Sequence, residues 1–144
     1  MPQTIRHLDR GYAAIGLDRV KNTLNIGSVL RAAGCFGASL VVVGGGRIGK
    51  SATDTMKAYR HVPSVAVDDV WQAIPFGAVP VVIELCDRAR PLQTITHPES
   101  AFYIFGPEDG SVRRDILDRA PVVAAIPAGC LNLAAAVNIV LYVR

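Results

Sequence analysis

The sequence has only three cysteines, and they show none of the spacings by which cysteines bind metals. Cys35, Cys86 and Cys130 each lie in a largely apolar stretch, as reduced intracellular thiols do. The N-terminus lacks an apolar run of signal-peptide type, because charged residues interrupt it between Arg6 and Arg10. These absences predict a cytoplasmic protein and give no indication of a metal site.

A large excess of one charge is also absent. Fifteen Lys and Arg residues against twelve Asp and Glu residues give a net charge of +3, which permits a nucleic-acid partner without demanding one. The distribution is more informative, because residues 47–61 hold four cations and a single acid. This segment predicts a patch that binds nucleic-acid phosphates, with a solvated helix face as the alternative. Its cations are Arg47, Lys50, Lys57 and Arg60.

The chain has one long stretch without formal charge, Pro121–Val143, which is long enough to cross a bilayer. Pro127, Ala128 and Gly129 form a predicted turn inside it, and Asn132 follows. A turn of this kind is unfavourable in a membrane span, where every backbone polar group needs a partner within the protein. The stretch is therefore interpreted as a buried strand, a loop and a buried helix.

The remaining pattern is typical of a single α/β domain. At 144 residues and 51% hydrophobic content the chain can bury one sizeable core, and it shows no internal repeat or linker. Short, continuous apolar runs predict strands buried on both faces at Tyr12–Leu17, Leu40–Val43, Ser64–Val67, Val79–Leu85, Phe102–Phe105 and Val122–Ile126. Helices are predicted between and after them at Ile26–Phe36, Ala52–Tyr59, Val70–Ile74, Arg113–Arg119 and Asn132–Tyr142. This alternation predicts a mostly parallel sheet with helices on both faces, in one domain of residues 1–144.

The first predicted helix has clear boundaries and two unlike faces. Asn25 is a suitable N-cap, and Gly37 a suitable residue after the C-terminus. At 100° per residue, Arg31 points away from the apolar face, as an ordinary exposed arginine also would. The apolar face consists of Ile26, Val29, Leu30, Ala33 and Phe36.

The last predicted helix is apolar all round apart from Asn138. A helix of this kind needs burial on every side, and a chain this small can hardly enclose it. Its surplus apolar face predicts a subunit interface.

One motif points to another chemistry. Gly44–Ser51 follows a predicted strand and satisfies the phosphate-binding pattern GxxxxGK[ST], in which Lys50 would reach nucleotide phosphates and Ser51 would bind Mg²⁺. A phosphate loop must lead into a well-packed helix, whereas Ala52–Tyr59 is basic and poor in core residues. A nucleotide-binding protein therefore remains an alternative, but it leaves the segments described next unexplained.

Three separated segments carry the main functional interpretation. Each places Gly, Asn or Pro beside a hydrophobic run, so each can expose backbone groups to a ligand. They are Asn25–Gly27 with Arg31, then Phe105–Gly110, then Ile126–Asn132. In this order they resemble the SpoU branch of the knotted S-adenosylmethionine-dependent RNA methyltransferases, over about Gly11 to Tyr142.

The resemblance implies a fold, a cofactor and partners. The C-terminal segment would thread a loop to form a deep trefoil knot, and two chains would pair through the C-terminal helix region. S-adenosylmethionine would lie at the turns after three strands, and no metal would be required. The implied cofactor residues are Glu84, Leu85, Gly106, Glu108, Gly110, Ile126, Gly129, Cys130 and Leu131.

The implied reaction is ribose 2′-O-methylation of tRNA or rRNA. Arg31 matches the family's catalytic arginine, and because a guanidinium stays protonated it would orient the 2′-hydroxyl and the adjacent phosphate. Asn25, Glu108 and Asn132 align with further motif residues, although they would serve equally to hold the loops together. Cys130 stands where many members have a serine proposed to help activate the arginine.

Arg31 would bind RNA together with the four cations of residues 47–61. Base methylation and a catalytically decayed RNA-binding protein of the same fold are the other outcomes that this resemblance leaves open.

Overall fold

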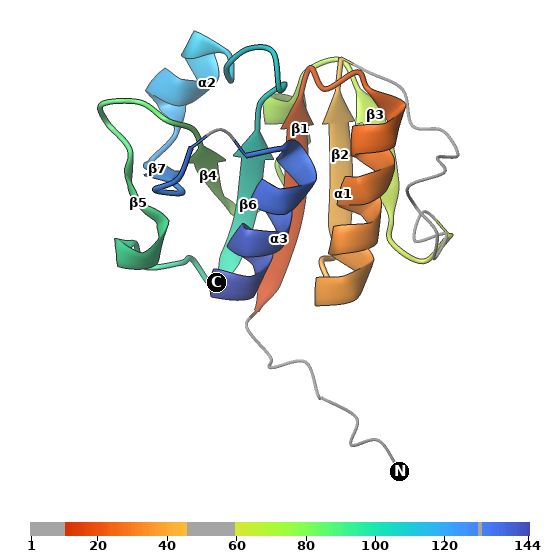
Figure 1. The fold of residues 1–144 in the computed structure, drawn as a ribbon. Coiled ribbons are helices and arrows are strands. Elements are labelled where there is room, and N and C mark those ends of the chain that lie inside the picture. The colour runs from red at the N-terminus through yellow and green to blue at the C-terminus, as the bar shows by residue number, and fades with distance from the viewer. Residues whose placement is uncertain (1–10, 46–59, 130) are drawn as a thin grey trace.

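The computed structural model describes residues 11–45, 60–129 and 131–144, which form one seven-stranded sheet (Figure 1). The strand order is β3-β2-β1-β6-β4-β7-β5, and every neighbouring pair is parallel. The strands are β1 Tyr12–Asp18, β2 Leu40–Gly44, β3 Ser64–Val67, β4 Val79–Ile83, β5 Arg90–Pro91, β6 Ser100–Phe105 and β7 Val122–Ala125. The predicted mostly parallel sheet is confirmed.

Helices cover both faces of this sheet, as predicted. On one face α1 (Thr23–Phe36) and α3 (Leu133–Val143) lie side by side, in front of the sheet in Figure 1. The other face carries the short 3₁₀ helix η2 (Val70–Ala73) and α2 (Arg114–Arg119). A second 3₁₀ turn, η3 (Leu92–Thr94), follows β5.

The central strands are apolar without interruption because both of their faces are buried. Along β1, Ile15 and Leu17 pack in the cluster that contains α1 and α3. Ala14, which precedes Ile15 and so points to the other face, packs in the cluster that contains η2 and α2. In β6, Tyr103 and Phe105 belong to the first cluster and Phe102 and Ile104 to the second. Each strand therefore connects two cores, which fixes its register.

The first helix begins one turn earlier than predicted. Asn22, and not Asn25, is the N-cap: its side-chain oxygen accepts from the backbone N–H of Leu24 at 2.9 Å and of Asn25 at 3.4 Å. Asn25 therefore lies inside the first turn. The predicted C-terminal residue is confirmed, because Gly37 has φ 70° and its N–H donates to the carbonyl of Ala33.

Several other expectations were wrong in detail. The fourth strand ends at Ile83, and Leu85 is 63% exposed beyond it. The helix predicted at Val70–Ile74 is the 3₁₀ turn η2, and β5 was missed. Strand β3 lies at the sheet edge, so it is not buried on both faces and its Val65 is 43% exposed.

Two further expectations concern cysteines and the basic segment. Cys35 and Cys86 are exposed, because their apolar neighbours in sequence do not surround them in space. The predicted helix Ala52–Tyr59 lies outside the described residues.

The C-terminal third of the chain links the two ends of the sheet. Strand β7 pairs with β4 and β5, and α3 then packs against α1 near the other end of the strand order. This path is compatible with the knot that the resemblance implies, which stays a prediction. Within the described residues, no helix combines the length and the apolar character needed to cross a membrane.

A polar cluster holds the C-terminal end of α3 against strands β1 and β6. The Tyr103 hydroxyl lies 2.8 Å from Nδ1 of His97 and accepts from Nε of Arg144 at 3.3 Å. Arg144 also donates to the backbone carbonyl of Tyr12 at 3.3 Å. Burial, together with the charge of Arg144, lowers the pKa of His97 below its ordinary value of 6.5, against an opposing backbone hydrogen bond at Leu92.

We expect this histidine to make the stability depend on pH. Because the pKa of His97 is lower in the folded chain, the unfolded chain binds more protons just below pH 6.5, and stability falls as pH drops through that range. Thermal unfolding at pH 7.5 and at pH 5.5 measures the fall. In His97→Gln the difference between the two melting temperatures should shrink, and an unchanged difference would contradict this assignment.

Candidate functional site

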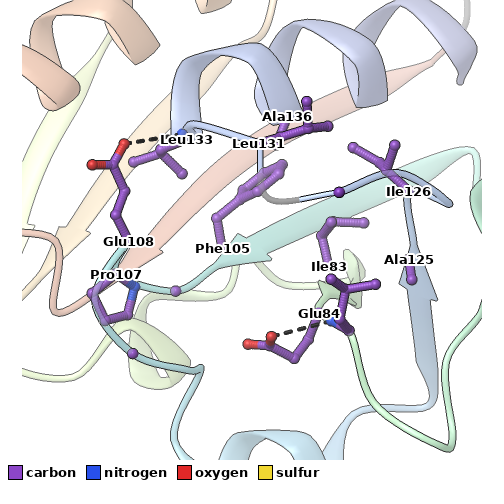
Figure 2. Close-up of a pocket in the computed structure, with 14 residues that line it drawn as sticks. Ile83, Glu84, Phe105, Pro107, Glu108, Ala125, Ile126, Leu131, Leu133 and Ala136 are labelled. Atoms are coloured by element: carbon purple, nitrogen blue, oxygen red, sulfur yellow. Dashed lines mark hydrogen bonds between the residues drawn. The ribbon is translucent and has the colours of Figure 1, made fainter.

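The turns after β4, β6 and β7 meet at the carboxyl ends of these strands and surround one cavity (Figure 2). Of the three predicted segments, Phe105–Gly110 and Ile126–Asn132 contribute to it, whereas Asn25–Gly27 and Arg31 do not. Ligand sites in open parallel sheets commonly lie at this edge. Every described residue of the predicted cofactor set lines the cavity: Glu84, Leu85, Gly106, Glu108, Gly110, Ile126, Gly129 and Leu131. Cys130 lies outside the described residues. The structure thus brings the set together, and its role in cofactor binding stays a prediction.

The cavity is a mainly apolar slot with polar groups at its edges. Figure 2 shows Phe105 at its centre, between Ile83 and Ile126 on one side and Leu133 and Ala136 of α3 on the other. Its volume of about 180 Å³ is below the range of about 300–1,000 Å³ usual for whole small-molecule sites. It therefore suits the buried, apolar part of a larger ligand whose polar parts lie over the rim.

The two ends of the loop between Gly106 and Val112 lie close together. A Cβ atom on Gly106 would lie 2.7 Å from the backbone nitrogen of Val112, so only glycine allows this approach. The Glu84 carboxylate accepts from the backbone N–H of Val112 at 2.9 Å and from that of Leu85 at 3.1 Å. Glu84 therefore joins the turn after β4 to the loop after β6.

Glu108 and Asn132 hold the beginning of α3. The Glu108 carboxylate accepts from the backbone N–H of Leu133 at 3.2 Å, and the Asn132 side chain accepts from that of Ala135 at 2.8 Å (Figure 2 shows the first contact). Both bonds satisfy N–H groups that a helix start leaves unpaired, and the acidic charge suits the helix N-terminus. The loop-holding role that sequence reasoning left open is therefore present for both residues.

A buried carboxylate beneath the site was missed by the sequence reasoning. Asp18, at the end of β1, is only 2% exposed, and it accepts from the backbone N–H of Arg113 at 2.9 Å. It also forms ion pairs with Nε of Arg113 and with Nε of Arg19, each at 3.3 Å. The available signal was a charged residue directly after a buried strand, which needs a partner.

Arg113 connects this carboxylate to the start of η2 through an ion pair with Asp69. Asp69 also accepts from the backbone N–H of Trp71, which caps η2. Burial alone would lower the pKa of Arg113, but the hydrogen bond from Arg113 to Asp69 and the nearby acids Asp18 and Asp115 raise it. The guanidinium therefore stays charged and keeps the cluster together.

A second cavity, of about 490 Å³, adjoins the first. One wall comes from the turn between β1 and α1, and the other from the loop after β6. Its lining residues are Arg19, Val20, Lys21, Asn22, Asn25, Pro107, Glu108 and Asp109. The predicted residues Asn25 and Glu108 therefore meet here.

Arg31 lines neither cavity. It is exposed on α1, six residues after Asn25, which corresponds to about 9 Å along a helix axis. Of the four predicted RNA-binding cations, Arg60 is exposed, whereas Arg47, Lys50 and Lys57 lie outside the described residues. In the described part of the chain, no three His, Cys, Asp or Glu side chains are grouped so as to hold a metal ion.

Comparison with known proteins gives a family match over nearly the whole chain. The model of the SpoU rRNA Methylase family matches residues 12–142. An uncharacterized tRNA/rRNA methyltransferase of Archaeoglobus fulgidus is 29% identical over 94% of this chain. The 23S rRNA (guanosine-2′-O-)-methyltransferase RlmB of Nitrosomonas europaea is 31% identical over 88% of it.

The fold is also that of a solved structure, an AdoMet-bound rRNA methyltransferase from Sinorhizobium meliloti. It superposes with a TM-score of 0.77 at 24% identity, over 92% of this chain and 55% of that one. The present chain spans 65% and 53% of the lengths of the Archaeoglobus and Nitrosomonas relatives.

We expect Gly106→Ala to destabilise the protein by about 1–3 kcal/mol, because the added methyl group would overlap the Val112 backbone. Gly110→Ala is the matched control in the same loop. Its added Cβ would meet only Pro107, at an ordinary 3.5 Å. Urea unfolding of the two variants measures the difference, and equal stabilities would contradict the close approach at Gly106.

Proposed function

The chain belongs to the SpoU rRNA methylase family, and from this premise we propose that it methylates a ribose 2′-hydroxyl of tRNA or rRNA with S-adenosylmethionine as donor. The observation that carries the proposal is the convergence of the turns after β4, β6 and β7 on one cavity at the carboxyl edge of the sheet. RNA methylation is common to the names of both curated relatives, and the 2′-O position is named for the Nitrosomonas enzyme.

The cavity's residues fit S-adenosylmethionine. Phe105, Ile126 and Leu131 give apolar surfaces for the adenosyl group. The Gly106–Val112 loop, whose ends lie close together, places backbone polar groups beside it. Glu108 places a carboxylate at the rim, which suits a cationic sulfonium. The Sinorhizobium structure of the same fold carries this cofactor. When bound, the cofactor supplies an electrophilic methyl group.

The chain's own residues then have to exclude water and position the acceptor. The apolar walls remove solvent from the reacting groups, and positioning supplies much of the acceleration in a transfer of this kind. Arg31 matches the family's catalytic residue, and its exposure on α1 leaves it accessible to RNA. As a permanent cation it orients the 2′-hydroxyl and the adjacent phosphate instead of accepting the proton.

The two alternatives predict different experimental results. A catalytically decayed RNA-binding protein would bind RNA but would not transfer a methyl group. Nucleotide binding at Gly44–Ser51 would require Gly44 so that the backbone can approach the phosphates. In the structure the backbone of Gly44 instead packs against Val70, because a Cβ on Gly44 would lie 2.9 Å from the Val70 side chain. This packing explains Gly44 without a nucleotide, while residues 46–59 lie outside the described part of the chain.

We also propose that the protein acts in the cytoplasm as a homodimer that pairs through the α3 region. Within α3, the apolar side chains of Tyr142 and Val143 are 70% and 41% exposed. Phe36 of α1 packs edge-on against Tyr142, with ring centroids 6.5 Å apart. Exposed apolar side chains of this kind are what subunit interfaces cover.

Calorimetric titration with S-adenosylhomocysteine tests the cofactor. We expect saturable binding by the wild type, and no saturable binding of Mg²⁺-ATP. Arg31→Ala should keep the affinity for S-adenosylhomocysteine within twofold and lose at least about a hundredfold in methyl transfer, because Arg31 lies outside the cavity. Arg114→Ala, which removes an exposed cation from α2, is the control that should retain activity.

Binding of ATP alone would overturn the proposal in favour of the Gly44–Ser51 loop. Binding of neither ligand would favour the decayed RNA-binding protein.

The position of the new methyl group distinguishes ribose from base methylation. Alkali cleaves RNA through attack by the 2′-hydroxyl, so a 2′-O-methyl group protects the following phosphodiester bond. We expect tRNA or rRNA treated with the protein and labelled S-adenosylmethionine to yield labelled, alkali-resistant dinucleotides. Label found only in alkali-released mononucleotides would mean base methylation and would contradict the 2′-O assignment.

A further inference from the structure

The second cavity has the size and position of a binding site for the acceptor. Its volume of about 490 Å³ falls within the usual range for small-molecule sites. Pro107 and Glu108 line both cavities, so the loop after β6 is a shared wall. A group bound in the second cavity would therefore lie beside the proposed methyl donor, where an acceptor has to be.

The chemistry of its walls suits a ribose phosphate better than a bare anion. The turn between β1 and α1 contributes the cations Arg19 and Lys21. The opposite loop contributes the carboxylates of Glu108 and Asp109, which would repel an isolated phosphate but accept a hydrogen bond from a ribose hydroxyl. A ligand that places a phosphate on the first wall and a ribose hydroxyl on the second matches both walls.

The backbone of Arg19 supports a ligand-binding role for its side chain. Among the described residues, Arg19 is the one non-glycine residue with positive φ, at 59°. This region is strained for a residue with a Cβ, and such strain tends to persist at functional sites. Gly45, directly after the neighbouring strand β2, adopts a similar φ of 69° without that cost.

The same side chain is held in a fixed direction. Its Nε lies 3.3 Å from buried Asp18, and its terminal NH₂ donates to the carbonyl of Ser111 at 2.6 Å. Although it is anchored in this way, the Arg19 side chain remains 46% exposed. The planar guanidinium group of Arg19 is thus held in place on the cavity wall, and Lys21 adds an exposed charge two residues later.

From these observations, and resting on the proposed function, we infer that the second cavity binds the ribose and phosphate of the target nucleotide of the RNA. Arg19 and Lys21 contact its phosphate, and Asp109 with Asn25 contacts its 2′-hydroxyl, the one free hydroxyl of a ribose inside an RNA chain. The turn between β1 and α1 is then an RNA-binding element in addition to the cations of residues 47–61.

Three single variants test this assignment. Arg19→Gly removes the cation and its ion pair with Asp18, while Asp18 keeps its ion pair with Arg113. The relief of the backbone strain offsets part of the stability lost with the Arg19 pair. Lys21→Gln removes the second cation from an exposed position. Arg114→Gln is the control with the same change in charge, on the exposed surface of α2, with its side chain 87% exposed.

The probe is a fluorescent single-stranded RNA decamer of mixed sequence, titrated in saturating S-adenosylhomocysteine at several salt concentrations. For Lys21→Gln and Arg19→Gly we expect a Kd at least about fivefold higher, and a slope of log Kd against log salt that is smaller by about 0.7, the value for one phosphate contact to a single strand. A merely structural role for Arg19 would leave that slope unchanged. Affinity for S-adenosylhomocysteine should stay within twofold in all three variants.

Each outcome separates this inference from the proposed function. If Lys21→Gln and Arg19→Gly match Arg114→Gln in Kd and slope while the wild type binds S-adenosylhomocysteine, the cavity does not hold the phosphate and the inference is overturned. If the two variants lose RNA affinity but no form of the protein binds S-adenosylhomocysteine, the RNA site is supported and the proposed methyl transfer fails.

Discussion

The carboxylate of Asp18 is the interaction on which the site's geometry depends. It is buried at the end of β1, accepts from the backbone of Arg113 and pairs with the side chains of Arg113 and Arg19. Removal of one partner from a buried ion pair costs on the order of 3 kcal/mol, because the remaining charge has no compensation. Asp18 therefore fixes the end of the loop after β6, just as Glu84 fixes that loop at Val112. Two carboxylates from two strand ends thus set the shape of the loop that separates the cavities.

Much of the fold could be predicted because the central strands are buried on both faces. Continuous apolar runs placed β1, β2, β6 and β7 within two residues of their observed bounds. The same reasoning failed where burial ends. Thr23 and Leu24 are exposed, so apolar periodicity gives no information about the first turn of α1, and the predicted cap Asn25 lies three residues after the observed cap Asn22. The two exposed residues of β5 leave no pattern at all.

The candidate site was predictable in its members but not in their connections. The turn residues Gly106, Ile126 and Gly129 follow strands, and parallel strands end at one edge, so their convergence follows from the fold. The contact of Asp18 with Arg113 joins residues 95 positions apart, and no local pattern contains it. Arg19 carries no sequence signal either, since its positive φ is a property of the turn in which it lies.

Structural and functional roles overlap in the motif residues, which limits what their substitution can reveal. Glu108 lines both cavities and also holds the N-terminus of α3, and Asn132 caps the same helix. A loss of activity after either is replaced would follow equally from a displaced helix, because a lost cap alone costs about 1 kcal/mol. Residues at the cavity wall that are exposed, such as Lys21, are therefore more informative about ligand contacts than the motif residues that identify the family. The family's most recognisable positions are the ones that assemble the loops, and specificity for a particular RNA has to come from the surface around them.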